Sequence, residues 1–78
     1  SDFYFSHLFK EMTGQSPTEF IIYSRIDQAK VLLTTTSLSV GEIAKQVGYA
    51  KSSNFILMFQ NRVGCSPLQF RKQQISRQ

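Results

Sequence analysis

The chain has 78 residues, of which 41% are hydrophobic and 13% aromatic, and a formal net charge of +4. This length allows one small domain, and the apolar content is high enough for a packed core, which excludes a disordered chain. No apolar run approaches the roughly 20 residues of a membrane-spanning helix, and the single cysteine, Cys65, excludes an internal disulfide and fits a reducing cytosol.

The charges are unevenly distributed. Residues 1–42 contain three basic and five acidic side chains, whereas residues 43–78 contain six basic side chains and no acidic one. A surface that serves only solubility would mix both signs, so the asymmetry indicates a polyanionic partner for the C-terminal half. The chain does not begin with methionine, and we therefore expect it to be part of a longer protein.

Start and stop signals predict five helices and no strand. Three capping boxes, each a serine followed three positions later by Glu or Gln, occupy residues 16–19, 39–42 and 66–69. Glycines that follow apolar segments, as helix terminators do, are Gly14, Gly48 and Gly64. We expect helices over residues 2–13, 17–35, 40–47, 52–63 and 67–75, and therefore an all-α domain.

The first expected helix begins a pattern that returns 50 positions later. The positions shared by the two copies are Phe5 and Phe55, Phe9 and Phe59, Gly14 and Gly64, and the Ser-Pro pairs at 16–17 and 66–67. Such a repeat is typical of one supersecondary unit used twice. Because the apolar positions agree and their neighbours differ, we expect the shared residues to face inward and the others outward.

The second expected helix is long, roughly 27 Å at 1.5 Å per residue. Its apolar residues fall on one broad arc and are Ile21, Ile22, Ile26, Ala29, Leu32 and Leu33. Arg25 lies inside the same arc. It could bury its stem and satisfy its guanidinium within the fold, or it could meet a phosphate of a partner.

Residues 42–59 have the pattern of a helix-turn-helix. Ala44 is small enough for two helices to cross closely, and Gly48 permits the reversal between them. The residues of the following helix expected to face inward are Phe55, Met58, Phe59 and Val63. Its opposite face carries Ser53 and Leu57, flanked by Gln60 and Asn61.

Five segments follow one another along the chain, namely SHLFKEMTGQSPTEFI, RIDQAKVLL, LSVGEIAKQVGY, SNFILMF and GCSPLQFRK. Their order and spacing are similar to those of the DNA-binding domain of AraC/XylS-family bacterial transcription regulators. The chain resembles that domain over nearly its whole length. The resemblance implies a homeodomain-like helical domain, in which two helix-turn-helix units joined by a linker helix place their recognition helices in successive major grooves, about 34 Å apart.

The resemblance also implies a division of the chain. Residues 1–14 would be the recognition helix of the first unit, 16–36 the linker helix, 39–63 the second unit and 66–76 a C-terminal helix. The helices that normally precede residue 1 are missing, so the first unit is expected to be incomplete, and its apolar side chains to lack part of their cover.

The outward positions and the family pattern together predict the DNA-contacting residues. In the first unit, the residues expected to face bases are Phe3, Ser6 and His7. Their equivalents in the second unit are Ser52, Ser53 and Leu57. Charge and exposure give the expected phosphate partners Lys10, Lys45, Lys51 and Arg62.

Two of these residues, His7 and Leu57, have an alternative role besides base contact. His7 could be a solvated surface residue rather than a groove contact. Leu57 stands where family members often carry Arg, and a leucine can at most touch a thymine methyl. The second unit could therefore grip mainly the DNA backbone, or Ile56 and Leu57 could face a protein.

The predicted function is that of a sequence-specific DNA-binding transcription regulator in the bacterial cytoplasm. Double-stranded DNA is the expected partner, RNA polymerase is a further candidate, and an effector-sensing domain is expected outside this chain. With one histidine, no paired carboxylates and no metal-ligand spacing, we expect no enzyme, metal or cofactor. The alternatives are a helical protein-interaction module and a fragment deficient in DNA binding, which differ from the main prediction in salt dependence.

Overall fold

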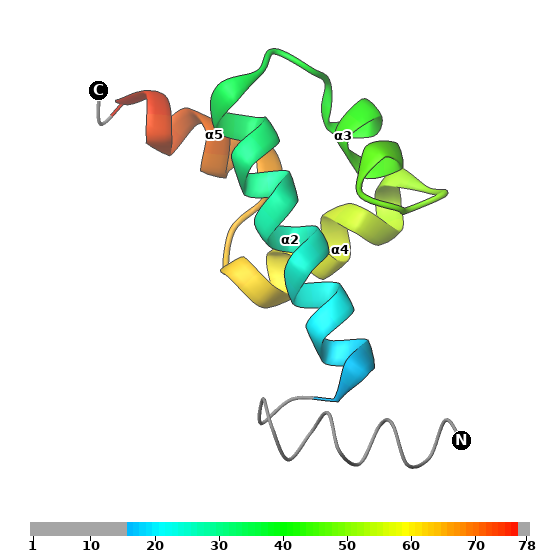
Figure 1. Cartoon of the computed structure of the whole chain (residues 1–78). Coiled ribbons are helices and arrows are strands. Elements are labelled where there is room, and N and C mark those ends of the chain that lie inside the picture. Colours follow the sequence, from blue (N-terminus) through cyan, green and yellow to red (C-terminus); the bar gives the residue numbers. More distant parts are fainter. Residues whose placement is uncertain (1–15, 77–78) are drawn as a thin grey trace.

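The computed structural model describes residues 16–76, which form four helices and no strand. The helices are α2 (Pro17–Thr35), α3 (Val40–Gln46), α4 (Ser52–Val63) and α5 (Pro67–Ser76). Figure 1 shows α3 beside the long α2, α4 crossing behind α2, and α5 near the C-terminal end of α2. The predicted all-α fold is confirmed for these residues, none of whose helices is long and apolar enough to cross a membrane. The helix expected over residues 2–13 lies outside them.

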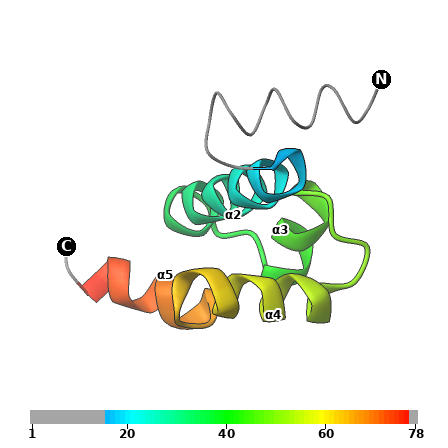
Figure 2. The same ribbon diagram turned by 90° about the horizontal axis from the view of Figure 1, so that it is seen from below.

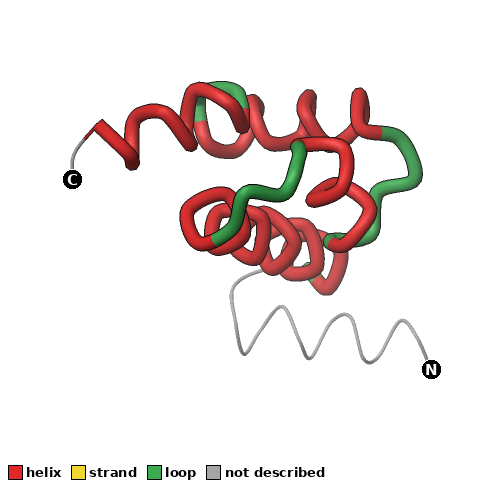
Figure 3. Tube along the Cα trace, turned by 90° about the horizontal axis from the view of Figure 1, so that it is seen from above, coloured by secondary structure: helices red, strands yellow, loops and turns green. Residues whose placement is uncertain are grey.

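The helices are stacked in two levels joined by short loops. Seen along the view of Figure 2, α2 lies above, α4 and α5 follow one another below, and α3 fills the space between. Figure 3 shows how little of the described chain is loop. Among the four described helices, none covers the outer side of α3 and α4.

The predicted helix ends agree closely with the observed ones. α2 and α4 have the expected bounds, and α5 runs one residue further, to Ser76. α3 ends at Gln46 rather than at residue 47. Val47 instead forms the C-cap, with φ −89° and ψ 3°. Its N–H donates to the carbonyl of Ile43 at 3.0 Å, and the N–H of Gly48 donates to the carbonyl of Lys45 at 3.2 Å.

Three of the four helices begin with the predicted serine caps. Each serine Oγ accepts a bond of 3.1 Å from the N–H three residues on: Ser16 from Glu19, Ser39 from Glu42, and Ser66 from Gln69. The box of α5 also forms its second bond, in which the Ser66 N–H donates to Gln69 Oε1 at 3.0 Å. α4 differs, because its N-cap, Lys51, makes no side-chain capping bond. Its first-turn N–H groups are therefore left without a serine or acidic cap.

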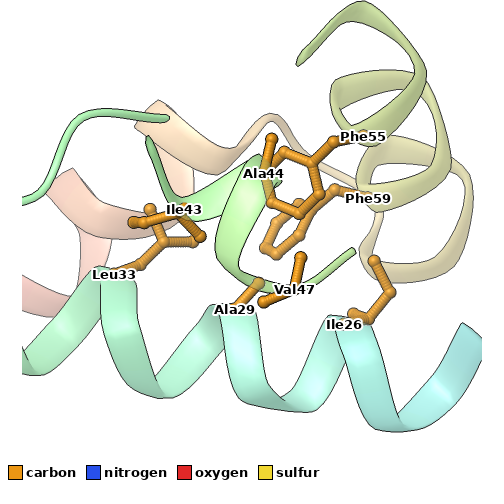
Figure 4. Close-up of a cluster of buried hydrophobic side chains, with 8 residues drawn as sticks. All are labelled: Ile26, Ala29, Leu33, Ile43, Ala44, Val47, Phe55 and Phe59. Atoms are coloured by element: carbon orange, nitrogen blue, oxygen red, sulfur yellow. The ribbon is translucent and has the colours of Figure 1, made fainter. Parts of the chain in front are cut away.

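The core is formed where α2, α3 and α4 meet. Its buried residues, drawn in Figure 4, are Ile26, Ala29, Leu33, Ile43, Ala44, Val47, Phe55 and Phe59. Ala44 is 0% exposed, which agrees with the close crossing expected at that position. Met58 and Val63 are half-buried at the edge of the same cluster, so the predicted inward face of α4 is confirmed.

One residue of the apolar arc of α2 is not buried. Ile21 lies on the predicted apolar arc but is 50% exposed. It sits at the edge of that arc and near the beginning of the helix, whereas the buried residues Ile26, Ala29 and Leu33 follow further along. Helical periodicity assigns a face to a residue, but it does not say how far along the helix the packing partners extend.

Arg71 joins α5 to the far end of α2. Its Nε–H donates to the carbonyl of Leu33 at 3.0 Å. Its Nη2 donates to the carbonyls of Leu38 at 2.7 Å and Thr36 at 3.3 Å. These carbonyls belong to the last turn of α2 and the connector to α3, so one guanidinium satisfies acceptors that the helix end leaves open.

The turn between α3 and α4 is held by a cation–π contact. Gly48 has φ +105°, a conformation that side chains beyond glycine rarely adopt. The Arg25 guanidinium lies 5.4 Å from the centroid of the Tyr49 ring, and a Cβ on Gly48 would be 3.1 Å from it. Arg25 thus makes a contact within the fold, which favours the first of the two alternatives that the sequence left open.

Candidate nucleic-acid interface

An open depression of about 570 Å³ separates the exposed side of α3 from the beginning of α4. Its lining residues are Ser39, Gly41, Glu42, Lys45, Ala50, Lys51, Ser52 and Ser53. Half of them are predicted DNA contacts, namely Lys45, Lys51, Ser52 and Ser53. The fold therefore brings together four of the predicted site residues around one concave surface. In Figure 1 this is the region at the right, where α4 begins beside α3.

The depression has the groups that bind a phosphate. Lys45 and Lys51 are exposed and supply two positive charges, against the single carboxylate of Glu42. Ser52 and Ser53 add hydroxyl donors on the first turn of α4. The positive end of the α4 dipole points into the same region, and Lys51 provides no side-chain cap to occupy it.

The solvent face of α4 is polar and uncharged around a single leucine. Leu57 is 60% exposed. Its neighbours three and four residues away on the helix are all exposed and are Ser53, Asn54, Gln60 and Asn61. Ser53 belongs both to this face and to the depression, so the two surfaces are continuous.

Arg62 is not brought together with the two lysines. It lines a separate pocket of about 240 Å³ between α2 and the end of α4, with Tyr23, Asp27 and Lys30. The physical reason is its position seven residues after the buried Phe55, because two helical turns return it to the α2 side of α4. Its role as a phosphate partner stays a prediction.

The remaining predicted residues of the first unit are Phe3, Ser6, His7 and Lys10, and they lie outside the described residues. Ser39 and Glu42 also line the depression, but the sequence indicated them only as a helix-capping pair. The spacing could have found Glu42, because a residue three positions before Lys45 shares its helix face. Within residues 16–76, no three His, Cys, Asp or Glu side chains are grouped so that they could hold a metal ion.

The apolar run Ile56-Leu57-Met58 does not form one exposed patch. Ile56 and Met58 are half-buried and pack against the core. A hollow of about 120 Å³ is lined by Ile56 together with Val40, Ser66, Pro67 and Leu68, and Leu57 is not part of it. Leu57 alone in this run projects from the solvent face.

The protein family described as "Helix-turn-helix domain" matches residues 1–73. The uncharacterized HTH-type transcriptional regulator YdiP of Escherichia coli (strain K12) is 40% identical over 70 residues, which cover 90% of this chain and 23% of that protein. The arabinose operon regulatory protein of the same strain is 36% identical over 66 residues, covering 85% of this chain and 23% of that protein. The chain thus spans about a quarter of the length of these curated relatives.

A solved structure is similar along the entire chain. The DNA-binding domain of AdpA, a global transcriptional factor crystallised in complex with a target DNA, superimposes with a TM-score of 0.95 at 31% identity. The match covers 100% of this chain and 70% of the AdpA chain. The similarity therefore extends to both sequence and fold.

Proposed function

Because this chain belongs to the AraC/XylS family of helix-turn-helix proteins, we propose that it binds double-stranded DNA with the surface formed by α3 and α4. The observation that carries the proposal is the convergence of Lys45, Lys51, Ser52 and Ser53 around one open depression. A DNA phosphate lies in this depression, and α4 lies in the adjacent major groove as a recognition helix.

The two surfaces perform different tasks. Phosphate contacts from Lys45 and Lys51 fix the position and angle of the domain on the duplex, and they are the same for every sequence. The major groove, about 12 Å wide, admits one α-helix. Since Ser53 joins the depression to the solvent face of α4, a phosphate held at the depression directs that face, with Leu57 at its centre, toward the base edges.

The first unit is proposed to bind DNA in the same way. Phe3, Ser6 and His7 would face bases, and Lys10 would contact a phosphate. α2, roughly 27 Å long, would place the two recognition helices in successive grooves about 34 Å apart. This proposal is supported by the similarity to the AdpA domain, which covers the whole chain and was solved with a target DNA.

The wider role proposed is transcription regulation in the bacterial cytoplasm. The chain corresponds to only 23% of each of the two named relatives, so an effector-sensing domain would lie in the remainder of the longer protein. Contact with RNA polymerase is proposed on the family resemblance alone. The proposal assigns no catalytic step and no cofactor to this chain.

Fluorescence anisotropy of the chain with a labelled mixed-sequence duplex tests the proposal. With the four predicted phosphate contacts, the logarithm of affinity should fall with the logarithm of salt at a slope of about −3.6, a loss of about 150-fold between 50 and 200 mM salt. An apolar protein-interaction surface would show no such dependence on salt. A folded chain that leaves the duplex unbound at 50 mM salt would contradict DNA binding.

A further inference from the structure

Leu57 is unusual among the exposed residues of α4. The other exposed side chains within one turn of it can all donate or accept hydrogen bonds, whereas leucine can do neither. At 60% exposure its side chain is available to a partner, and it lies at the centre of the face that is opposite the buried Phe55 and Phe59. A leucine in this place excludes water from whatever it touches.

Packing within residues 16–76 does not account for this leucine. Ile56 and Met58 on either side contact the core, but Leu57 is absent from the core cluster and from the residues packed against it. It is also absent from the apolar hollow between α4 and α5. An apolar protein partner would be expected to cover several apolar residues together, yet Leu57 is surrounded by Ser53, Asn54, Gln60 and Asn61.

The charge around this face favours DNA as its occupant. Lys45 and Lys51 lie beside Ser53 at the depression, and the chain has no acidic residue after Glu42. A leucine that is held against base edges needs an apolar group there. In the major groove the only such group is the C5-methyl of thymine, because every other edge position is a hydrogen-bond donor or acceptor or a plain ring C–H.

We propose that Leu57 is a specificity-determining residue that selects thymine by contact with its C5-methyl group. The proposal rests on the proposed function, since it requires α4 in the major groove. Cytosine would present an unmethylated C5 and an amino group at the same place, and the amino group would lose water without gaining a partner. The second unit would thus read its site by shape and methyl contact as well as by polar side chains.

The test removes one methyl group from the DNA. Duplexes that the chain selects from a random-sequence pool are resynthesised with uracil in place of each thymine in turn, and their affinities are measured by anisotropy. We expect one replacement to weaken wild-type binding about fourfold, the factor that corresponds to burying one methyl-sized group. The L57A variant should bind the thymine and uracil duplexes equally, and L57M, which keeps an apolar contact, should retain the difference.

A second exposed leucine provides the matched control. Leu68 is 53% exposed at the beginning of α5 and lies off the proposed DNA-contacting face, so L68A should keep the fourfold difference. The proposal is overturned, with DNA binding intact, if L57A discriminates thymine from uracil as the wild type does. It also fails if no single replacement affects wild-type binding. A chain that selects no duplex from the pool would overturn the proposed function itself.

Discussion

Replacing Lys51 by alanine should reduce the salt dependence of DNA binding by one phosphate contact. Lys51 is exposed, lines the depression and precedes the first turn of α4. Each phosphate neutralised contributes about −0.9 to the slope of log affinity against log salt. With four contacts in the wild type, K51A should make the slope less steep, changing it from about −3.6 to about −2.7. The loss of affinity between 50 and 200 mM salt should then shrink from about 150-fold to about 40-fold.

The matched control is K72A, which removes the same charge from the exposed side of α5, away from the depression. Anisotropy titrations at four or five salt concentrations give both slopes. Because the Lys51 side chain makes no capping bond, K51A should also leave the thermal unfolding temperature nearly unchanged. Equal reductions of slope in K51A and K72A would refute the reasoning, since overall charge rather than the depression would then control binding. A K51A slope equal to that of the wild type would also refute the reasoning.

Three further predictions concern stability and are checked by thermal or urea unfolding followed by circular dichroism. G48A should destabilise the domain by about 1–3 kcal/mol, because of the positive φ and the nearby Arg25 guanidinium. G41A should be neutral or stabilising, because the position is helical and a Cβ there would meet only Ser39 Oγ, at 4.0 Å. Equal effects of the two substitutions would contradict the strain argument. Y49F should stabilise the domain by about 1 kcal/mol, because the Tyr49 hydroxyl is buried and no residue of the described segment pairs with it; a loss of stability would point to a partner for that hydroxyl. R71A should cost about 2–3 kcal/mol through the loss of bonds to three carbonyls, and R71K should recover only part of it; full recovery by lysine would show that charge rather than the guanidinium fork matters.

Local signals in the sequence predicted most of the fold. The serines at positions 16, 39 and 66 cap helices in the structure because a capping box needs only four consecutive residues. The inward face of α4 followed from helical periodicity, which placed Phe55 and Phe59 on one side and Leu57 on the other. Gly48 was identified from the reversal it permits, and its positive φ confirms that reading.

The role of charged side chains could not be predicted in the same way. Arg71 was one of six basic residues that suggested a polyanionic partner, yet it satisfies carbonyl groups 33 to 38 positions earlier in the chain. Arg25 rests on Tyr49, and Arg62 faces the pocket that contains Asp27. Each of these arrangements joins elements that are distant in sequence, so local residue spacing does not predict it.

The candidate site could be predicted in part from the sequence. Lys45, Lys51, Ser52 and Ser53 were proposed separately, from charge, exposure and the family pattern. Their arrangement around one depression depends on the angle between α3 and α4, which is set by the close packing at Ala44 and the turn at Gly48. Sequence indicates which residues are available for binding, and tertiary packing decides which of them act together.

The most direct test of the DNA-binding surface is a nitrogen–proton correlation spectrum of the isotope-labelled chain, recorded before and after addition of a duplex at low salt. We expect the backbone amide signals of Ser52, Ser53 and Leu57 to shift most. That of Leu68, beside the apolar hollow, should remain in place. Large shifts at Leu68 with unchanged signals from α4 would contradict this prediction, because the duplex would then contact the apolar hollow rather than the solvent face of α4.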